Sequence, residues 1–353
     1  MGGGCHVLSV TIETAVFAPP PIDASAELVR NFVETLLDWK NAMDDQRLDV
    51  YTSRFAPDVL INCNLYPIRP QLKALLAQAA VFEYDANTVA VLAETILNRS
   101  DKIEDKLGIS DVLVSDLALN PNVFAHYAPS QLLEDAQRCV IVLSLANRFV
   151  NDPTLRGHAI AIRTSNVATA VQVKCLIQDI EHIRDDLGGV PIAPEHFEGS
   201  ILVCSSCHHL LVSVDEIEML RGAADERQLA AAIRVGLYKR YVFAGTPLRW
   251  EDLPNFSIGH AFFASLTRHH VMSGSGLAER LVRAVIETIC HDKLDATHAL
   301  RIGQGPGDAQ RQRGADLAWR RDIDRDFHLH YWECDTGIVE LALLVVHNDF
   351  SIP

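Results

Sequence analysis

Two runs of alternating apolar and polar residues, 327–334 and 338–346, constrain the fold more than any other feature of the sequence. A short connection that ends in Gly337 separates them, and connections of this kind join antiparallel strands. Because successive side chains of a strand point to opposite faces, each run would bury one face and expose the other. A slip of one residue would send Leu329 and Tyr331 to the wrong face. We therefore predict an antiparallel hairpin in a defined register.

Arginines and histidines are concentrated around this hairpin. The arginine fork matches the geometry of a phosphate, and histidine is the side chain that gains and loses a proton near neutral pH. A sheet edged with such residues is suited to hold a phosphate and to move a proton. The residues concerned are Arg320, Arg321, Arg325, His328, His330 and His347.

The length of the chain, 353 residues, suits two or three compact domains. We expect a mixed α/β body over residues 1–270, with a mainly helical subdomain at 1–138 and a β-rich subdomain with helices at 139–270. For residues 271–353 we expect a small α+β domain in which a helix precedes an antiparallel sheet. The glycines and prolines of residues 244–260 are typical of a linker or a long loop.

The spacing of apolar residues predicts several individual elements. Apolar positions that recur every three to four residues predict one helix after Ser25 and another at 277–290. The continuous apolar run 139–145, rich in β-branched residues, is typical of a central strand. The stripe of the first helix consists of Val29, Phe32, Val33, Leu36 and Leu37. Further strands are expected at 158–163, 170–177 and 200–203, and a mixture of helix and loop at 100–128.

The formal net charge of the chain is −15 at pH 7, which argues against non-specific binding to nucleic acid because the summed field repels phosphate. Between residues 301 and 325, however, six arginines stand against four aspartates. This local basic patch suits selective contact with RNA or DNA, or with an acidic protein partner. The sequence has neither an apolar run long enough to span a membrane nor a secretory signal, so we expect a cytoplasmic protein without membrane contact.

The C-terminal residues 277–350 resemble the RelE/YoeB-type bacterial ribonuclease toxins. Those are small domains in which helices pack on an antiparallel sheet, and they cut mRNA, usually on the ribosome. The likeness lies in the order of a helix, a basic loop, two strands, a turn and a last strand. The residues that carry it are Trp319, Arg321 and Ile323 in one strand, Leu329 and Tyr331 in the next, and His347 at the end of the last.

The resemblance implies an endoribonuclease that needs no metal ion or other cofactor. It also implies a toxin–antitoxin or antiphage role, in which the N-terminal body regulates the C-terminal domain. Cleavage by the 2′-hydroxyl of RNA needs a base, an acid and a cation over the phosphorane. By position in the family pattern, His328 and His347 are the candidate catalytic residues, together with Arg321. The candidates for contact with RNA are Arg311, Arg313, Arg320, Arg325 and His330.

The chain departs from the family pattern at two places. The loop 303–314 contains no glutamate that could act as the family's acid/base carboxylate, and Asn348 stands where many relatives carry tyrosine. A competing reading is therefore a non-enzymatic interaction or scaffold protein whose arginine loop binds an acidic partner.

Two further patterns suggest metal chemistry. Cys204 and Cys207 have the spacing of half a zinc knuckle, which makes them candidate zinc ligands. Gln172 and Lys174 form a triplet that some restriction-type DNA nucleases use, with an acidic residue such as Asp152, to hold Mg²⁺ and steady the scissile phosphate. A metal-dependent DNA nuclease centred on Lys174 is thus a second alternative.

Overall fold

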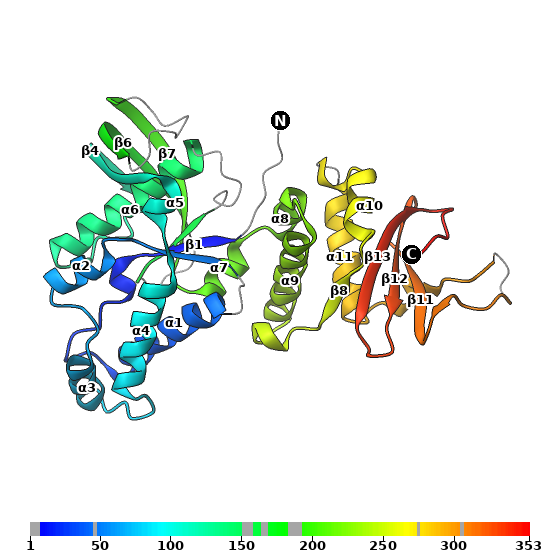
Figure 1. The fold of residues 1–353 in the computed structure, drawn as a ribbon, viewed down its shortest axis with the longest axis horizontal. Helices are drawn as coiled ribbons and strands as arrows, with labels where there is room; N and C mark the ends of the chain where they lie inside the picture. The colour runs from blue at the N-terminus through cyan, green and yellow to red at the C-terminus, as the bar shows by residue number, and fades with distance from the viewer. Residues whose placement is uncertain are drawn as a thin grey trace. The chain divides into compact units, whose positions relative to one another are not determined.

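The computed structural model divides into two compact units, Val7–Ser213 and Val214–Pro353 (Figure 1). The expected boundary lay near residue 270, but helices α8 (Glu216–Gly222) and α9 (Glu226–Phe243) belong to the second unit, because α9 packs on both α8 and α11 (Leu277–Ile289). The residues that the structure describes are 8–44, 48–149, 158–163, 169–182, 193–273, 276–303 and 307–353. Among them, no helix has the length and apolar composition needed to cross a membrane.

A seven-stranded sheet forms the centre of the Val7–Ser213 unit. Its strands are β1 (Ser9–Ile12), β2 (Asp49–Thr52), β3 (Asp101–Lys102), β4 (Ile109–Asn120), β5 (Ala159–Ala161), β6 (Thr169–His182) and β7 (Glu195–Cys204). They lie in the order β3-β2-β1-β5-β7-β6-β4, and all are parallel except β6, which is antiparallel to both its neighbours. The chain moves outward from β1 to β3 and later returns to the other side of β1. The strand order therefore reverses between β1 and β5.

Helices lie around this sheet, some of them in direct contact with its strands (Figure 1). They are α1 (Ala26–Asp44), α2 (Ala56–Asn62), α3 (Arg69–Gln78), α4 (Ala86–Arg99), α5 (Ile103–Leu107), α6 (Ser130–Phe149) and α7 (Cys207–Ser213). Helix α1 packs with α4 and α7, and α6 packs with α2 and with β4, β6 and β7. A 3₁₀ turn, η1 (Thr14–Val16), directly follows β1 and contacts α1, α2 and α6. Parallel strands are buried between helices in this type of fold.

Several predicted elements of this unit are confirmed. Helix α1 buries Val29, Phe32, Val33 and Leu36 of the predicted stripe, and Leu37 is 36% exposed at its edge. The strands expected at 158–163, 170–177 and 200–203 correspond to β5, β6 and β7.

Three expectations for this unit were wrong. The stretch 100–128, expected to be a mixture of helix and loop, contains the long strand β4, which pairs with β6. A helical subdomain at 1–138 and a β-rich one at 139–270 do not exist, since β5 pairs with β1 and β6 pairs with β4. The run 139–145, predicted as a strand, lies within α6, where every one of its residues is buried. A helix segment that is buried on all sides shows no apolar period, so its pattern cannot be told from that of a buried strand.

The Val214–Pro353 unit contains the predicted C-terminal sheet. Its strands are β8 (Phe256–Ile258), β9 (Thr297–Ala299), β10 (Gln312–Arg313), β11 (Asp316–Asp322), β12 (Phe327–Glu333) and β13 (Val339–Val346). They lie in the order β10-β11-β12-β13-β8, and β9 pairs with β11. The β12–β13 hairpin is antiparallel as predicted, with an irregularity between His330 and Tyr331, and β8 is parallel to β13. The mixed α/β fold class, with a largely antiparallel C-terminal sheet, is thereby confirmed. The expectation that each strand exposes one face was wrong for β12, where the five consecutive residues 328–332 are buried because both faces of the sheet are covered. Strand β8 falls in the stretch 244–260, which was expected to be a linker or loop.

The two faces of this sheet are covered differently. Helices α10 (Phe262–Arg268) and α11 pack on one face. On the other face the segment after β13 folds back, so that Nε1 of Trp332 donates to the carbonyl oxygen of Pro353 at 3.0 Å. Phe350 and Ile352 pack there against a small buried cluster of Leu300, Ala318, Trp332 and Ala342.

Candidate functional site

Strands β9, β11 and β12 bring polar side chains to the face of the sheet opposite α11. Arg320 is paired in register with His330 and with His298, and Asp322 is paired with His328. Directly opposed residues of antiparallel strands share a face, as do residues two apart in one strand. The alternation therefore places these five side chains on one face.

Asp322, His328 and His347 form a continuous chain of polar contacts. Nδ1 of His328 lies 2.8 Å from Oδ1 of Asp322, and its Nε2 lies 2.8 Å from Nδ1 of His347. His328 is 1% exposed, whereas His347, just after β13, is exposed. Burial lowers the pKa of His328; the Asp322 carboxylate opposes this effect, and Arg320 and His347 add to it. His328 is therefore neutral at neutral pH.

The contact with Asp322 favours one arrangement of protons between the two rings. An ionised carboxylate only accepts hydrogen bonds, so a proton on Nδ1 of His328 suits the nearby Asp322, although this nitrogen makes no hydrogen bond of regular geometry. Nε2 of His328 then accepts from Nδ1 of His347. The backbone N–H of His347 is anchored to the carbonyl oxygen of Asp326 at 2.9 Å. The chain thus presents one exposed histidine, oriented by a buried one.

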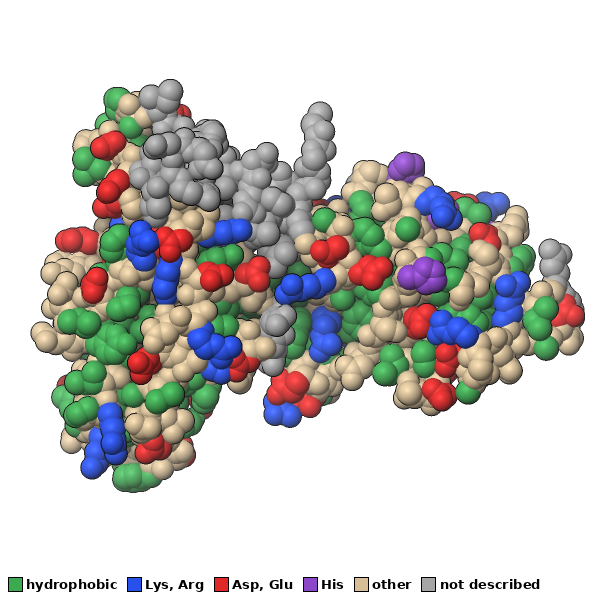
Figure 2. Space-filling view, in the orientation of Figure 1, with side chains coloured by type: hydrophobic (Ala, Val, Ile, Leu, Met, Phe, Trp, Pro, Cys, Tyr) green, Lys and Arg blue, Asp and Glu red, His purple; other side chains and the backbone are tan. Residues whose placement is uncertain are grey.

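Two neighbouring residues complete this cluster. Nε2 of His298 lies 3.5 Å from Oδ2 of Asp322, and the two side chains are 47% and 44% exposed. The guanidinium of Arg320 lies 5.8 Å from the ring centre of Phe350 and makes no ion pair with any residue in the described ranges. Figure 2 shows histidine and basic side chains together on the surface of this unit. The cluster therefore combines two exposed histidines with one uncommitted cation.

Sequence reasoning missed Asp322 and His298 as site residues. The signal for Asp322 was present, because it is two positions from Arg320 in the same strand and shares its face. His298 lies on the three-residue strand β9, for which the sequence carries no recognisable pattern.

Arg321 does not belong to this cluster, contrary to the prediction that it acts with His328 and His347. It lies between Arg320 and Asp322 in β11, so strand alternation turns it toward α11. There it is 1% exposed, and Nη1 donates to Oε2 of Glu287 at 3.1 Å. Nη2 donates to the carbonyl oxygen of Asp292. Arg321 is a buried structural ion-pair residue.

Arg313 is also committed to contacts within the protein. It donates to both carboxylate oxygens of Glu340, at 2.9 and 2.8 Å, and forms an ion pair with Asp316 at 3.1 Å. Its guanidinium lies 4.7 Å from the ring centre of Trp332. Hydrogen bonding to Glu340 raises the pKa of Arg313 above its usual value. Two carboxylates thus neutralise the charge that was expected to contact RNA.

The other predicted RNA contacts differ in their availability. Arg311 is half-buried, and its Nε donates to the carbonyl oxygen of Arg301 at 3.0 Å. His330 is fully buried, its Nδ1 lies 2.7 Å from the carbonyl oxygen of Ser351, and burial lowers its pKa to about 4. It is therefore uncharged and inaccessible. Arg325 is exposed and has no ion pair within the described part of the chain.

Within the described part of the chain, the two candidate metal sites have no further ligands. Cys204 and Cys207 are both 1% exposed, and burial raises the pKa of Cys204, which keeps its sulfur a thiol. Nζ of Lys174 forms an exposed ion pair with Glu198 at 2.7 Å, and Asp152 lies outside the described residues. No group of three or more His, Cys, Asp or Glu side chains is placed to hold a metal ion anywhere in the described ranges.

A buried polar network lies beside the carboxyl ends of β1 and β2 in the other unit. Nη2 of Arg138 lies 2.8 Å from Oγ of Ser53, 3.1 Å from Oε1 of Glu104 and 2.8 Å from Oδ1 of Asp135. Next to it, Oε1 of Glu13 accepts a hydrogen bond from Tyr127 at 2.6 Å. One guanidinium balances only part of the charge of two carboxylates in this network, and burial raises the pKa of Glu13 to about 7.

We expect Glu13→Gln to remove a pH-dependent loss of stability. Burial raises the pKa of Glu13 from its ordinary value of 4.5 to about 7, so the folded state keeps the proton up to about pH 7. The free energy of unfolding therefore falls as the pH rises between these two values. The accumulated loss is ~3 kcal/mol above that window. Denaturant titrations at several pH values should show this loss in the wild type and not in Glu13→Gln. The exposed Glu94→Gln is the control; equal pH dependence in all three proteins would contradict the assignment.

Comparisons with family models, curated proteins and solved structures gave no significant match. The function must therefore be argued from the geometry of the Asp322–His328–His347 chain and its neighbours.

Proposed function

We propose that the Val214–Pro353 unit is a metal-independent endoribonuclease, with its active site at Asp322, His328, His347, His298 and Arg320. The observation that carries the proposal is the chain of polar contacts from Asp322 through the buried His328 to the exposed His347. The order of α11, an arginine-bearing loop and strands β11 to β13 also supports it, since the resemblance to the RelE/YoeB-type toxins rests on that order. A regulatory Val7–Ser213 unit and a toxin–antitoxin or antiphage setting belong to the same proposal.

The proposed reaction is transfer of the RNA phosphate to its own 2′-hydroxyl. Nε2 of His347 takes the proton of the 2′-hydroxyl, whose oxygen forms a new bond to phosphorus. Arg320 balances the negative charge of the phosphorane. The bond from phosphorus to the 5′-oxygen breaks, and His298 delivers a proton to that oxygen. The products are a 2′,3′-cyclic phosphate and a 5′-hydroxyl end, so protons and bonds balance without a metal ion.

The reaction leaves a signature that an assay can read directly. We expect the full-length protein to cleave single-stranded RNA equally with and without EDTA, and to leave 2′,3′-cyclic phosphate ends. An oligonucleotide with a 2′-deoxy sugar at the cleavage position should not be cut, because it lacks the nucleophile. Cleavage of this deoxy substrate, or loss of activity in EDTA, would rule out the mechanism.

A further inference from the structure

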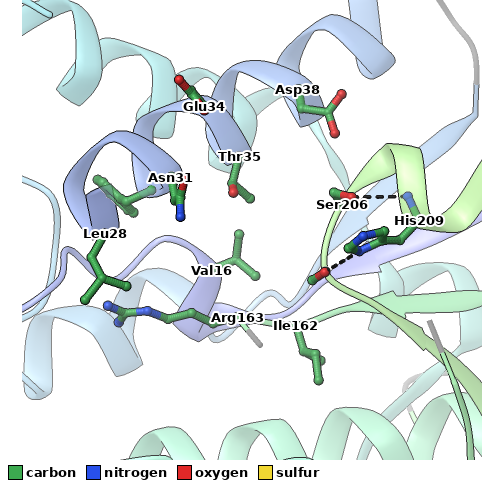
Figure 3. A pocket seen from close by; sticks show the side chains of 12 residues that line it. Val16, Leu28, Asn31, Glu34, Thr35, Asp38, Ile162, Arg163, Ser206 and His209 are labelled. Atoms are coloured by element: carbon green, nitrogen blue, oxygen red, sulfur yellow. Dashed lines mark hydrogen bonds between the residues drawn. The ribbon is translucent and has the colours of Figure 1, made fainter. Parts of the chain in front are cut away.

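A cavity lies within the Val7–Ser213 unit, at the carboxyl ends of β1, β5 and β7. Its volume is about 470 Å³, within the range of sites that enclose a small organic ligand. Helix α1 forms one wall (Figure 3). Val16 of η1, Ile162 and Arg163 after β5, and Ser206 before α7 form the opposite side.

The position of this cavity in the fold points to ligand binding. The strand order of the sheet reverses between β1 and β5. In open α/β sheets, the connections that leave two such strands diverge to opposite sides and open a crevice at their carboxyl ends, where ligands bind. The cavity is lined by residues that follow β1 and β5, so it occupies this crevice.

The lining has different chemistry at its two ends (Figure 3). At one end the guanidinium of Arg163 extends below Leu28. At the other end Nδ1 of His209 is held by Oγ of Ser205 at 2.6 Å. Asp38 is already engaged there, because it accepts a hydrogen bond from the backbone N–H of Cys207 at 2.9 Å.

Apolar and amide-bearing side chains lie between these two ends. Val16, Phe32 and Ile162 provide an apolar surface, and the amide of Asn31 and the hydroxyl of Thr35 project from α1. A flat ring fits against such a surface, and an asparagine amide can both donate to and accept from the edge of a nucleobase. The guanidinium fork of Arg163 matches a phosphate.

We propose that this cavity binds a nucleoside monophosphate, with the phosphate at Arg163 and the base between α1 and the strand ends. The cavity is large enough for one nucleotide and offers one cation, one apolar surface and hydrogen-bonding groups for a base edge. This site lies in the Val7–Ser213 unit and is independent of the proposed ribonuclease. A nucleoside 5′-monophosphate also contains no phosphodiester bond for a ribonuclease to cut.

Calorimetric titration of the full-length protein with AMP, GMP, CMP and UMP tests this proposal. We expect at least one of them to bind with a Kd on the order of 10 µM, and the matching nucleoside to bind at least about tenfold more weakly. Arg163→Met should weaken binding of the nucleotide to the level of the nucleoside and leave binding of the nucleoside unchanged. Arg69→Met, which removes an exposed arginine of α3, should change neither.

A second variant tests the location of the base. Thr35→Trp should fill the cavity and abolish binding of both ligands. If this variant does not fold, the nearly isosteric Asn31→Asp takes its place and should weaken binding of both ligands. The proposal is overturned if none of the four nucleotides binds below ~1 mM. It is equally overturned if Arg163→Met binds the nucleotide as tightly as the wild type, or if nucleoside and nucleotide bind equally.

Discussion

Replacing His347 with alanine should lower the rate of RNA cleavage at least about 100-fold, the usual contribution of a positioned general base. The loss should appear in kcat, because His347 acts on the reacting proton rather than on the rest of the RNA. His347 is exposed and ends a strand, so the variant should fold normally. Single-turnover cleavage of a labelled RNA measures the effect, with circular dichroism as the check on folding.

His260→Ala is the matched control, since His260 is another exposed histidine of the same unit. It should cleave RNA at the wild-type rate. Unchanged cleavage by His347→Ala would refute the active-site assignment and favour the reading of this unit as an interaction module.

A variant of His328 separates positioning from direct catalysis. His328→Gln can keep a hydrogen bond to His347 but cannot pass on the influence of Asp322, so the pH profile of kcat should move while KM stays the same. If His328→Gln behaved as the wild type does in rate and in pH profile, the buried histidine would have no role in orienting His347.

The C-terminal hairpin was predictable because several independent constraints agree. Alternation over two runs, a short turn at Gly337 and matched lengths favour an antiparallel pairing that buries Leu329 and Tyr331, and the two runs are paired with one shift in register between His330 and Tyr331. Helices α1 and α11 were predictable because each has one apolar face and one polar face. Sequence patterns identify elements whose apolar residues recur with a clear period.

Fully buried elements and long-range pairings were not predictable in the same way. Helix α6 is apolar on every side over residues 139–145, so its period is lost. Strand β4 pairs with β6, about 60 residues later in the chain, and its residues are mostly half-buried or exposed. Strands from residues 1–138 and from residues 139–213 form one sheet because of such long-range pairings. A local sequence pattern does not encode them.

The candidate site was predicted in part for the same physical reason. His328 and His347 were identified from the ends of the hairpin strands. In the structure Nε2 of His328 lies 2.8 Å from Nδ1 of His347. Arg321 was assigned to the wrong face of the sheet. The sequence did not show how β11 pairs with β12, and without that register the face of each β11 residue is unknown. A count from the observed pairing of Asp322 with His328 places Arg320 on the site face and Arg321 against α11.

Replacing Arg138 with alanine should destabilise the Val7–Ser213 unit by about 3–5 kcal/mol at neutral pH, the usual cost of leaving a buried ion partner unpaired. The side chain of Arg138 is 14% exposed, and those of Glu104 and Asp135 are 1% and 4% exposed. Burial alone would lower the pKa of Arg138, but the carboxylates raise it above its usual value, so the guanidinium is charged. Denaturant titration of the free energy of unfolding measures the loss.

A variant without the buried charges identifies the cause of this loss. The triple variant Arg138→Met, Glu104→Gln, Asp135→Asn should recover most of it at neutral pH, because no buried charge is left unpaired. Arg54→Ala is the control: its ion pair with Asp105 is exposed, and its loss should cost about 1 kcal/mol or less. If Arg138→Ala cost no more than Arg54→Ala, or if the triple variant were as unstable as Arg138→Ala, unpaired buried carboxylates would not be the cause of the loss.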